Sequence, residues 1–166
     1  MATTVYIPLA LSSINLADAN AYWTAIDGTN FDYGVFAFIH SSTGTLVFEG
    51  IIPQNVAGTP AWDIVLYHKS ATGTNGNISI TADAMAYSTA ENYDVALTSL
   101  TVTKATATTT QATISLLNGG SLDGTLAVTA GEKFVLSLSR VGADSTDTYV
   151  DSWYLLGSPV LKIDVT

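Results

Sequence analysis

Apolar residues recur along this chain with a period of two or in short continuous runs, and clusters of Gly, Asn, Pro or Ser interrupt them. This pattern is typical of β-strands joined by turns. Only residues 16–23 have a pattern that admits a helical turn. The predicted strands lie at residues 5–11, 33–40, 45–52, 62–69, 77–87, 95–103, 112–117, 133–141 and 151–165.

The predicted strand 133–141 shows how its two faces differ. Phe134, Leu136 and Leu138 share one face, and the opposite face carries Ser137 and Ser139. One-sided strands without helices favour two packed sheets, and the chain length with its long connections favours a jelly roll over an immunoglobulin fold. We therefore predict an all-β protein, a two-sheet antiparallel β-sandwich of jelly-roll type with about 8–10 strands.

The 166 residues suit one domain that is long enough to bury a continuous core. We therefore predict a single jelly-roll domain at 1–166, in which residues 1–20 form an extended N-terminal assembly segment. Hydrophobic residues make up 48% of the chain and charged residues only 11%, below the share of about 25% in an average soluble domain. A surface with so little charge suits permanent contact with neighbouring molecules.

Two segments are candidates for such contacts. In residues 33–40 both strand faces are apolar, as expected of a strand that is covered on both sides or lies at a subunit interface. The N-terminal segment is apolar and barely charged. The candidate contact residues are Val5, Tyr6, Ile7, Val35, Phe36 and Phe38.

The charge balance excludes several classes of function. With 14 acidic and 5 basic residues the net charge is -9, so no basic patch is expected to neutralise the phosphates of a nucleic acid. The chain has no cysteine for disulfides or thiolate metal sites. It has no apolar run of the length that crosses a membrane and no secretory signal pattern. We expect a soluble protein made in a cytoplasm.

The densest group of ionisable residues follows the chain's single arginine. Arg140 shares the strand parity of the apolar residues before it, so its guanidinium points toward the core side or the rim and requires a partner. A carboxylate of the next segment, Asp147 or Asp151, would form a bidentate pair. The alternative is a calcium site of Asp144, Asp147 and Asp151. Their spacing matches no calcium-loop motif, and the arginine would repel the ion.

No reaction can be assigned from the sequence. It contains no serine in a nucleophile elbow and no phosphate loop, and we expect neither an enzyme nor a cofactor. Trp62 and Trp153 share parity with aliphatic neighbours and are expected in the core. Trp23, with Tyr22 beside it, is the best candidate for an exposed ring that stacks on a sugar.

The last two thirds of the chain resemble small jelly-roll structural proteins of tailed bacteriophages. In these proteins a strand of the type W-x-[IL]-x-L-x-Y precedes a glycine-rich turn. An AGE or AGD turn then leads into a strand that ends in arginine, followed by an Asp-Thr loop. The matching residues are Trp62, Leu66, Tyr67, Ala130, Gly131, Glu132, Arg140, Asp147 and Thr148. The resemblance favours the ion pair of Arg140 as part of the fold.

Two functions remain open. The resemblance implies a virion structural protein, first a capsid decoration protein. Such a protein would form a homotrimer, bind the major capsid protein and be located in the virion after synthesis in the host cytoplasm. The alternative is a carbohydrate- or receptor-binding module of a phage tail appendage, with Trp23 and Tyr22 as sugar contacts. Neither function involves nucleic acid or a membrane.

Overall fold

The computed structural model describes residues 3–14, 20–56, 60–72, 75–88, 91, 98–106, 112–117 and 126–166. Within this part of the chain all regular structure is β-strand, and no helix is present that could cross a membrane. The strands are β1 (Thr3–Pro8), β2 (Ala10–Ile14), β3 (Ala21–Ile26), β4 (Tyr33–Phe38), β5 (Thr43–Ile51), β6 (Trp62–Ser70), β7 (Gly76–Tyr87), β8 (Thr98–Thr106), β9 (Ala112–Leu117), β10 (Lys133–Val141), β11 (Trp153–Leu155) and β12 (Val160–Val165).

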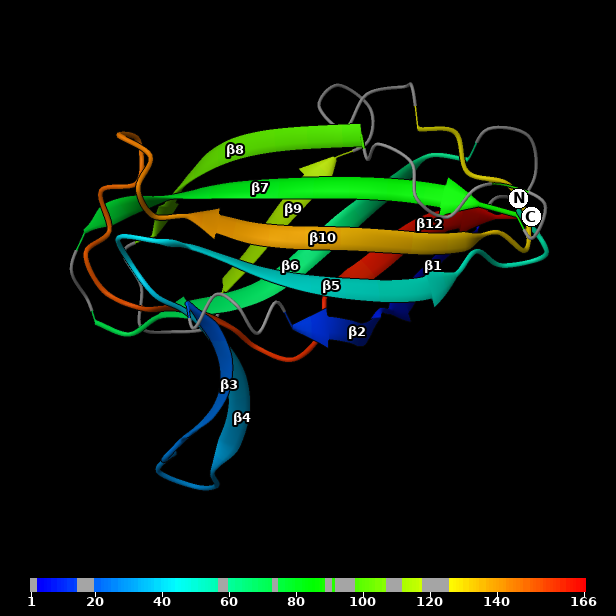
Figure 1. The fold of residues 1–166 in the computed structure, drawn as a ribbon. Coiled ribbons are helices and arrows are strands. Elements are labelled where there is room, and N and C mark those ends of the chain that lie inside the picture. The colour runs from blue at the N-terminus through cyan, green and yellow to red at the C-terminus, as the bar shows by residue number, and fades with distance from the viewer. Residues whose placement is uncertain are drawn as a thin grey trace.

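The strands form two antiparallel sheets that pack face to face (Figure 1). The larger sheet follows the hydrogen-bonding order β1-β12-β6-β11-β4-β3, with β9 also paired to β6, and the smaller sheet has the order β2-β5-β10-β7-β8. This arrangement confirms the predicted antiparallel β-sandwich of jelly-roll type. The described residues form twelve strands and not the predicted 8–10, because β3 was not predicted and each of the predicted strands 5–11 and 151–165 corresponds to two strands. The β3–β4 hairpin projects away from the body of the sandwich (Figure 1).

Two short strands, β11 and β12, share one edge of β6. β11 pairs with residues 68–70 of β6, and residues 160–163 of β12 pair with residues 62–65 of β6. β9 pairs with the opposite edge of β6. The connection between them contains Gly157 at a φ of 73°, a left-handed conformation that favours glycine. Because β4 pairs with β11 and β1 pairs with β12, the hairpin and the N-terminal strand lie along the same side of the larger sheet.

Aromatic rings link the two sheets across the core. Trp62 of β6 meets Phe134 of β10 with ring centroids 5.3 Å apart, and Phe36 of β4 meets Phe48 of β5 at 5.8 Å. Both pairs are nearly perpendicular, as aromatic quadrupoles prefer. Trp62 and Trp153 are both buried, which confirms the prediction that they fill the core.

The strand at residues 33–40 is covered on both sides by the chain itself, which is the first of the two alternatives that the sequence left open. Val35, Phe36 and Phe38 are 0%, 5% and 0% exposed within the single chain, so both faces of β4 are already covered. Phe36 and Phe38 belong to the core. On the opposite face, Ala37 lies level with Tyr22 of β3 and Tyr154 of β11. Large side chains on both flanking strands explain how the second face is covered.

The N-terminal segment is part of the sandwich where the structure describes it. Residues 3–8 pair with β12, and residues 10–14 pair with β5. Val5 and Ile7 pack against the core, whereas Tyr6 is 60% exposed. Residues 1–2 and 15–19 of the proposed assembly segment 1–20 lie outside the described residues. A role in assembly stays a prediction, but residues 3–14 are edge strands and not a free arm.

A buried histidine joins β6 to β11. The indole Nε1 of Trp153 donates a hydrogen bond of 3.0 Å to Nδ1 of His68. Burial lowers the pKa of His68 below its ordinary value. The same bond requires Nδ1 to be unprotonated, so charging the imidazole would also break its contact with Trp153.

The stability of the protein is therefore expected to fall as the pH drops below about 6.5, the pKa of an unfolded histidine. His68 has a lowered pKa in the folded state, so the unfolded state takes up the proton first and is favoured. Urea unfolding measured between about pH 7 and pH 5 tests this expectation. A His68→Gln variant should lose that slope, and an unchanged slope would assign it to other groups.

Candidate functional site

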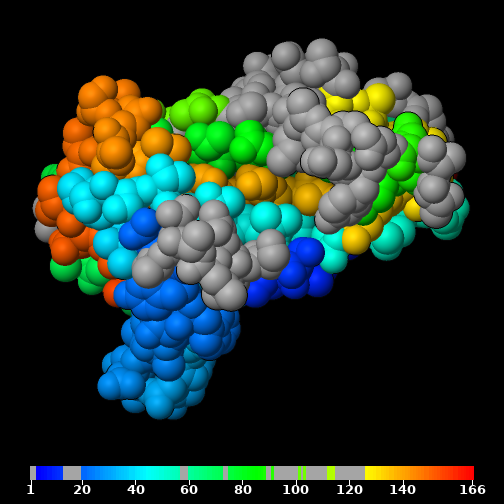
Figure 2. All heavy atoms as spheres, viewed as in Figure 1, coloured from blue at the N-terminus to red at the C-terminus, as the bar shows by residue number. Residues whose placement is uncertain are grey.

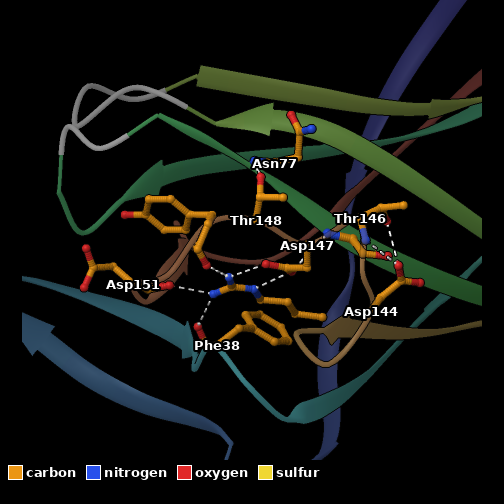
Figure 3. Close-up of polar contacts among 10 residues, drawn as sticks. Phe38, Asn77, Asp144, Thr146, Asp147, Thr148 and Asp151 are labelled. Carbon is orange, nitrogen blue, oxygen red and sulfur yellow. Dashed lines mark hydrogen bonds and ion pairs between the residues drawn. The ribbon is translucent and has the colours of Figure 1, made fainter.

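Arg140 is the centre of a buried polar cluster at the end of β10 (Figure 3). Its side chain is 0% exposed and forms a bidentate pair with Asp147, through Nη2 to Oδ1 at 2.7 Å and Nε to Oδ2 at 2.9 Å. The guanidinium also donates to the backbone carbonyls of Asp151, Phe38 and Tyr149. The structure thus contains the predicted pair between Arg140 and Asp147.

The other two aspartates have different partners. Asp151 contributes only its carbonyl to Arg140, and its carboxylate accepts a hydrogen bond of 2.7 Å from Thr72. Asp144 accepts from the backbone N and the hydroxyl of Thr146, and these bonds lower its pKa. Asp151 as ion-pair partner is thus wrong.

The calcium alternative fails for the same reason. The three carboxylates diverge onto separate partners (Figure 3), and no group of three or more potential ligands for a metal occurs in the part of the chain that the structure describes. The backbone N of Ser79 also donates to Asp147 at 3.0 Å. The cluster links the connection after β10 to Phe38 of β4 and Ser79 of β7.

The β3–β4 hairpin is the feature that departs most from a plain sandwich (Figures 1 and 2). Trp23 is 57% exposed, and its ring covers Gly34, where a Cβ would lie only 1.9 Å from the ring. The ring also meets the edge of Phe36, with centroids 4.9 Å apart. Trp23 is therefore exposed on the same face of the larger sheet as the core residue Phe36.

The opposite face, which we call the outer face, is rich in tyrosine. Along β6, Trp62, Ile64 and Leu66 belong to the core, so the alternate positions lie on the outer face. The strand register then sets one row across the sheet, consisting of Lys69, Tyr154, Ala37 and Tyr22. Burial raises the pKa of Tyr154, and the proximity of Tyr22 adds to the effect.

Lys69 shows that the hairpin curls toward the outer face. Its Nζ donates a hydrogen bond of 2.9 Å to the hydroxyl of Tyr33 and lies 5.6 Å from the centre of that ring. Lys69 and Ala37 both lie level with Tyr154 of β11. Tyr33 is four residues away from Ala37 on β4, a distance of about 13 Å along the strand. A flat sheet would separate the two side chains, so the hairpin bends over this part of the face.

An open hollow of about 320 Å³ lies beneath the curled hairpin. Phe31 at the hairpin tip is 71% exposed and meets the edge of Tyr33 at 6.0 Å. Asp32 Oδ1 accepts a hydrogen bond from the backbone of Gly28 and thereby shapes the loop. The hollow therefore combines aromatic rings with an ammonium, a carboxylate and an amide. Its lining residues are Ile26, Asp27, Gly28, Thr29, Asn30, Phe31, Tyr33 and Lys69.

The structure separates the two predicted sugar contacts. Tyr22 and Trp23 are both exposed, at 42% and 57%, but adjacent residues of a strand point to opposite faces. Tyr22 lies on the outer face with the hollow, and Trp23 lies on the other face. Sequence reasoning missed Tyr33 and Lys69, because only the strand register and the bend of the hairpin bring them together.

Comparison with known proteins identifies the fold and not a family. No protein-family model and no curated protein matches the chain. An isomalto-dextranase of Arthrobacter globiformis complexed with panose is similar over 96% of this chain, with a TM-score of 0.55 and 14% identity. This chain spans only 23% of that enzyme.

A second similar structure is a family 11 carbohydrate-binding module from Clostridium thermocellum in complex with a mixed-linked tetrasaccharide. The similar region includes 93% of this chain and 95% of that module, with a TM-score of 0.47 and 10% sequence identity. A family 35 carbohydrate-binding module from the same organism is similar over 98% of this chain and 97% of that module, with a TM-score of 0.42 and 13% sequence identity. At these identities the likeness concerns the fold alone.

Proposed function

We propose that this protein is a carbohydrate-binding module and that it binds sugar in the hollow between the β3–β4 hairpin and the outer face. The observation that carries the proposal is the contact of Lys69 with Tyr33 at the wall of that hollow. The contact fixes an aromatic ring and a hydrogen-bond donor side by side in an open site.

The chemistry of the hollow suits a neutral sugar. The C–H face of a pyranose packs on an aromatic ring such as Tyr33 or Phe31, and its hydroxyls require both donors and acceptors. Lys69 supplies the donor, Asp27 an acceptor and Asn30 both. The sandwich fold that the chain shares with carbohydrate-binding modules is consistent with this function.

The proposal agrees in part with the alternative that the sequence left open, a carbohydrate- or receptor-binding module of a phage tail appendage. Sugar binding is common to both, whereas the tail location stays a prediction and the proposed site is not built on Trp23 and Tyr22. The resemblance to phage structural proteins, the homotrimer and the major capsid protein as partner stay predictions. The capsid decoration role has lost one argument, because Val35, Phe36 and Phe38 are buried within the single chain. We therefore place carbohydrate binding first.

Isothermal titration with panose and with soluble glucan, xylan and galactan oligosaccharides tests the proposal. We expect at least one of these sugars to bind, and the Tyr33→Ala variant to bind it about tenfold more weakly, equivalent to about 1.4 kcal/mol. Lys69→Met should have a similar effect, because it removes the donor and retains most of the apolar stem. Failure of every sugar to bind would refute the proposal.

Two further variants separate the site from the fold. Ile51→Ala removes an exposed apolar side chain on the smaller sheet and should leave affinity unchanged. Gly28→Ala should weaken binding with little loss of overall stability, because a Cβ there would lie 2.1 Å from the carbonyl oxygen of Phe31 and would force the loop to rearrange. Wild-type affinity in both Tyr33→Ala and Gly28→Ala would place the sugar elsewhere.

A further inference from the structure

A second hollow, of about 220 Å³, lies on the outer face away from the hairpin. Its walls come from β1, β6 and β12 together with the residue before β6. The register places Asp63, Lys162 and Tyr6 in one row, and Thr4 and Asp164 in the next. The lining residues are Thr4, Ala61, Trp62, Asp63, Lys162 and Asp164.

The second hollow shares an ammonium and carboxylates with the first, and an exposed aromatic ring lies beside it and not in its lining. Tyr6 is 60% exposed in the same row as Lys162 and so presents a ring beside an ammonium. Asp63 is only 5% exposed, and Asp164 accepts a hydrogen bond of 2.7 Å from the hydroxyl of Thr4. The carboxylate of Asp164, positioned by Thr4, lies near the ammonium of Lys162 and the ring of Tyr6, and these groups are again suited to the hydroxyls and the C–H face of a sugar.

The two hollows are connected along a single strand. Lys69 borders the first and Asp63 borders the second, and the two residues are six positions apart along β6, which corresponds to about 20 Å. Between them the outer-face positions of β6 are Tyr67 and Val65, and Val65 is level with Val160 of β12. Val65 is buried, at 9% exposure, so the partly exposed residues between the hollows are Tyr67 and Val160, and both are uncharged.

We propose that the two hollows are subsites for one linear polysaccharide, whose internal segment lies along β6 with Tyr67 beneath its middle. This inference rests on the proposed function and adds the class of ligand, an extended chain and not a terminal sugar. The separation of about 20 Å exceeds the length of a disaccharide. A short sugar therefore reaches only one subsite, whereas a chain of several residues reaches both.

Titrations with the disaccharide and the hexasaccharide of each glucan, xylan and galactan series test the inference. The wild-type protein should bind the hexasaccharide about tenfold more tightly than the disaccharide. Tyr6→Ala should remove this gain and leave disaccharide affinity unchanged, because the disaccharide occupies the hairpin subsite. Tyr33→Ala should weaken the binding of both sugars.

The outcomes distinguish the two proposals. Equal affinities for the disaccharide and the hexasaccharide, or an unchanged hexasaccharide affinity in Tyr6→Ala, would overturn the extended subsite and leave the hairpin site intact. Absence of binding by every sugar would overturn both. Ile51→Ala serves as the matched control for an exposed apolar residue, and thermal unfolding of each variant confirms that it is folded.

Discussion

Replacing Arg140 with alanine is expected to lower the free energy of unfolding by about 3–5 kcal/mol. The guanidinium is fully buried and satisfies both carboxylate oxygens of Asp147 together with three backbone carbonyls. Its removal leaves a buried carboxylate without its counter-charge, and the cost of such a charge exceeds the value of the pair itself. Urea unfolding monitored by tryptophan fluorescence measures the loss.

Lys133 provides the matched control, because it also forms an ion pair between a basic side chain of β10 and a carboxylate. Its partner Glu49 and the lysine are both partly exposed, at 27% and 34%. Solvent screens this pair, so Lys133→Ala should destabilise the protein far less than Arg140→Ala. Similar small losses in the two variants would show that the Arg140 cluster does not lock the connection after β10.

Trp153→Ala is expected to cost a similar amount, about 3–5 kcal/mol, through the cavity that it leaves. Trp153 is 0% exposed, packs on Phe38 with centroids 5.3 Å apart and is hydrogen-bonded to His68. It also anchors β11, a strand of only three residues that carries Tyr154 onto the outer face. Ligand binding should therefore weaken together with stability.

Two tryptophan variants test whether burial is the cause. Trp153→Phe keeps an aromatic ring and loses the bond to His68, so it should cost about 1–2 kcal/mol. Trp23→Ala removes a ring that is 57% exposed and should destabilise the protein less than Trp153→Ala. If Trp23→Ala proved the more destabilising of the two, the hairpin and not the core would hold the sandwich together.

The alternation of apolar and polar residues was sufficient to predict strands but not the hairpin that carries the site. Residues 16–23 admitted a helical turn. Residues 16–19 lie outside the described part of the chain, and Ala21–Ile26 is a strand. Its partner β4 was predicted, and the pairing with β4 determines the structure of residues 21–26. The hydrophobic pattern predicts secondary structure poorly in a segment that has no clear period and that forms a strand only because it pairs with a neighbouring strand.

Local pattern also could not distinguish two ways of covering a strand. An apolar strand at residues 33–38 is compatible with a neighbouring subunit or with side chains of the same chain. The register decides, because it places Tyr22 and Tyr154 on either side of Ala37. These three residues are far apart in the sequence, so their adjacency exists only in the folded sheet.

The sequence alone determined the all-β sandwich, the core positions of Trp62 and Trp153, and the pairing of Arg140 with a carboxylate of the next segment. Each depends on strand parity or on a partner nearby in the chain, which are local properties. Only the tertiary structure decided that Lys69 meets Tyr33, that Asp151 contributes a carbonyl and not its carboxylate, and that two hollows share one face. These depend on register and on the bend of a hairpin, which long-range packing sets.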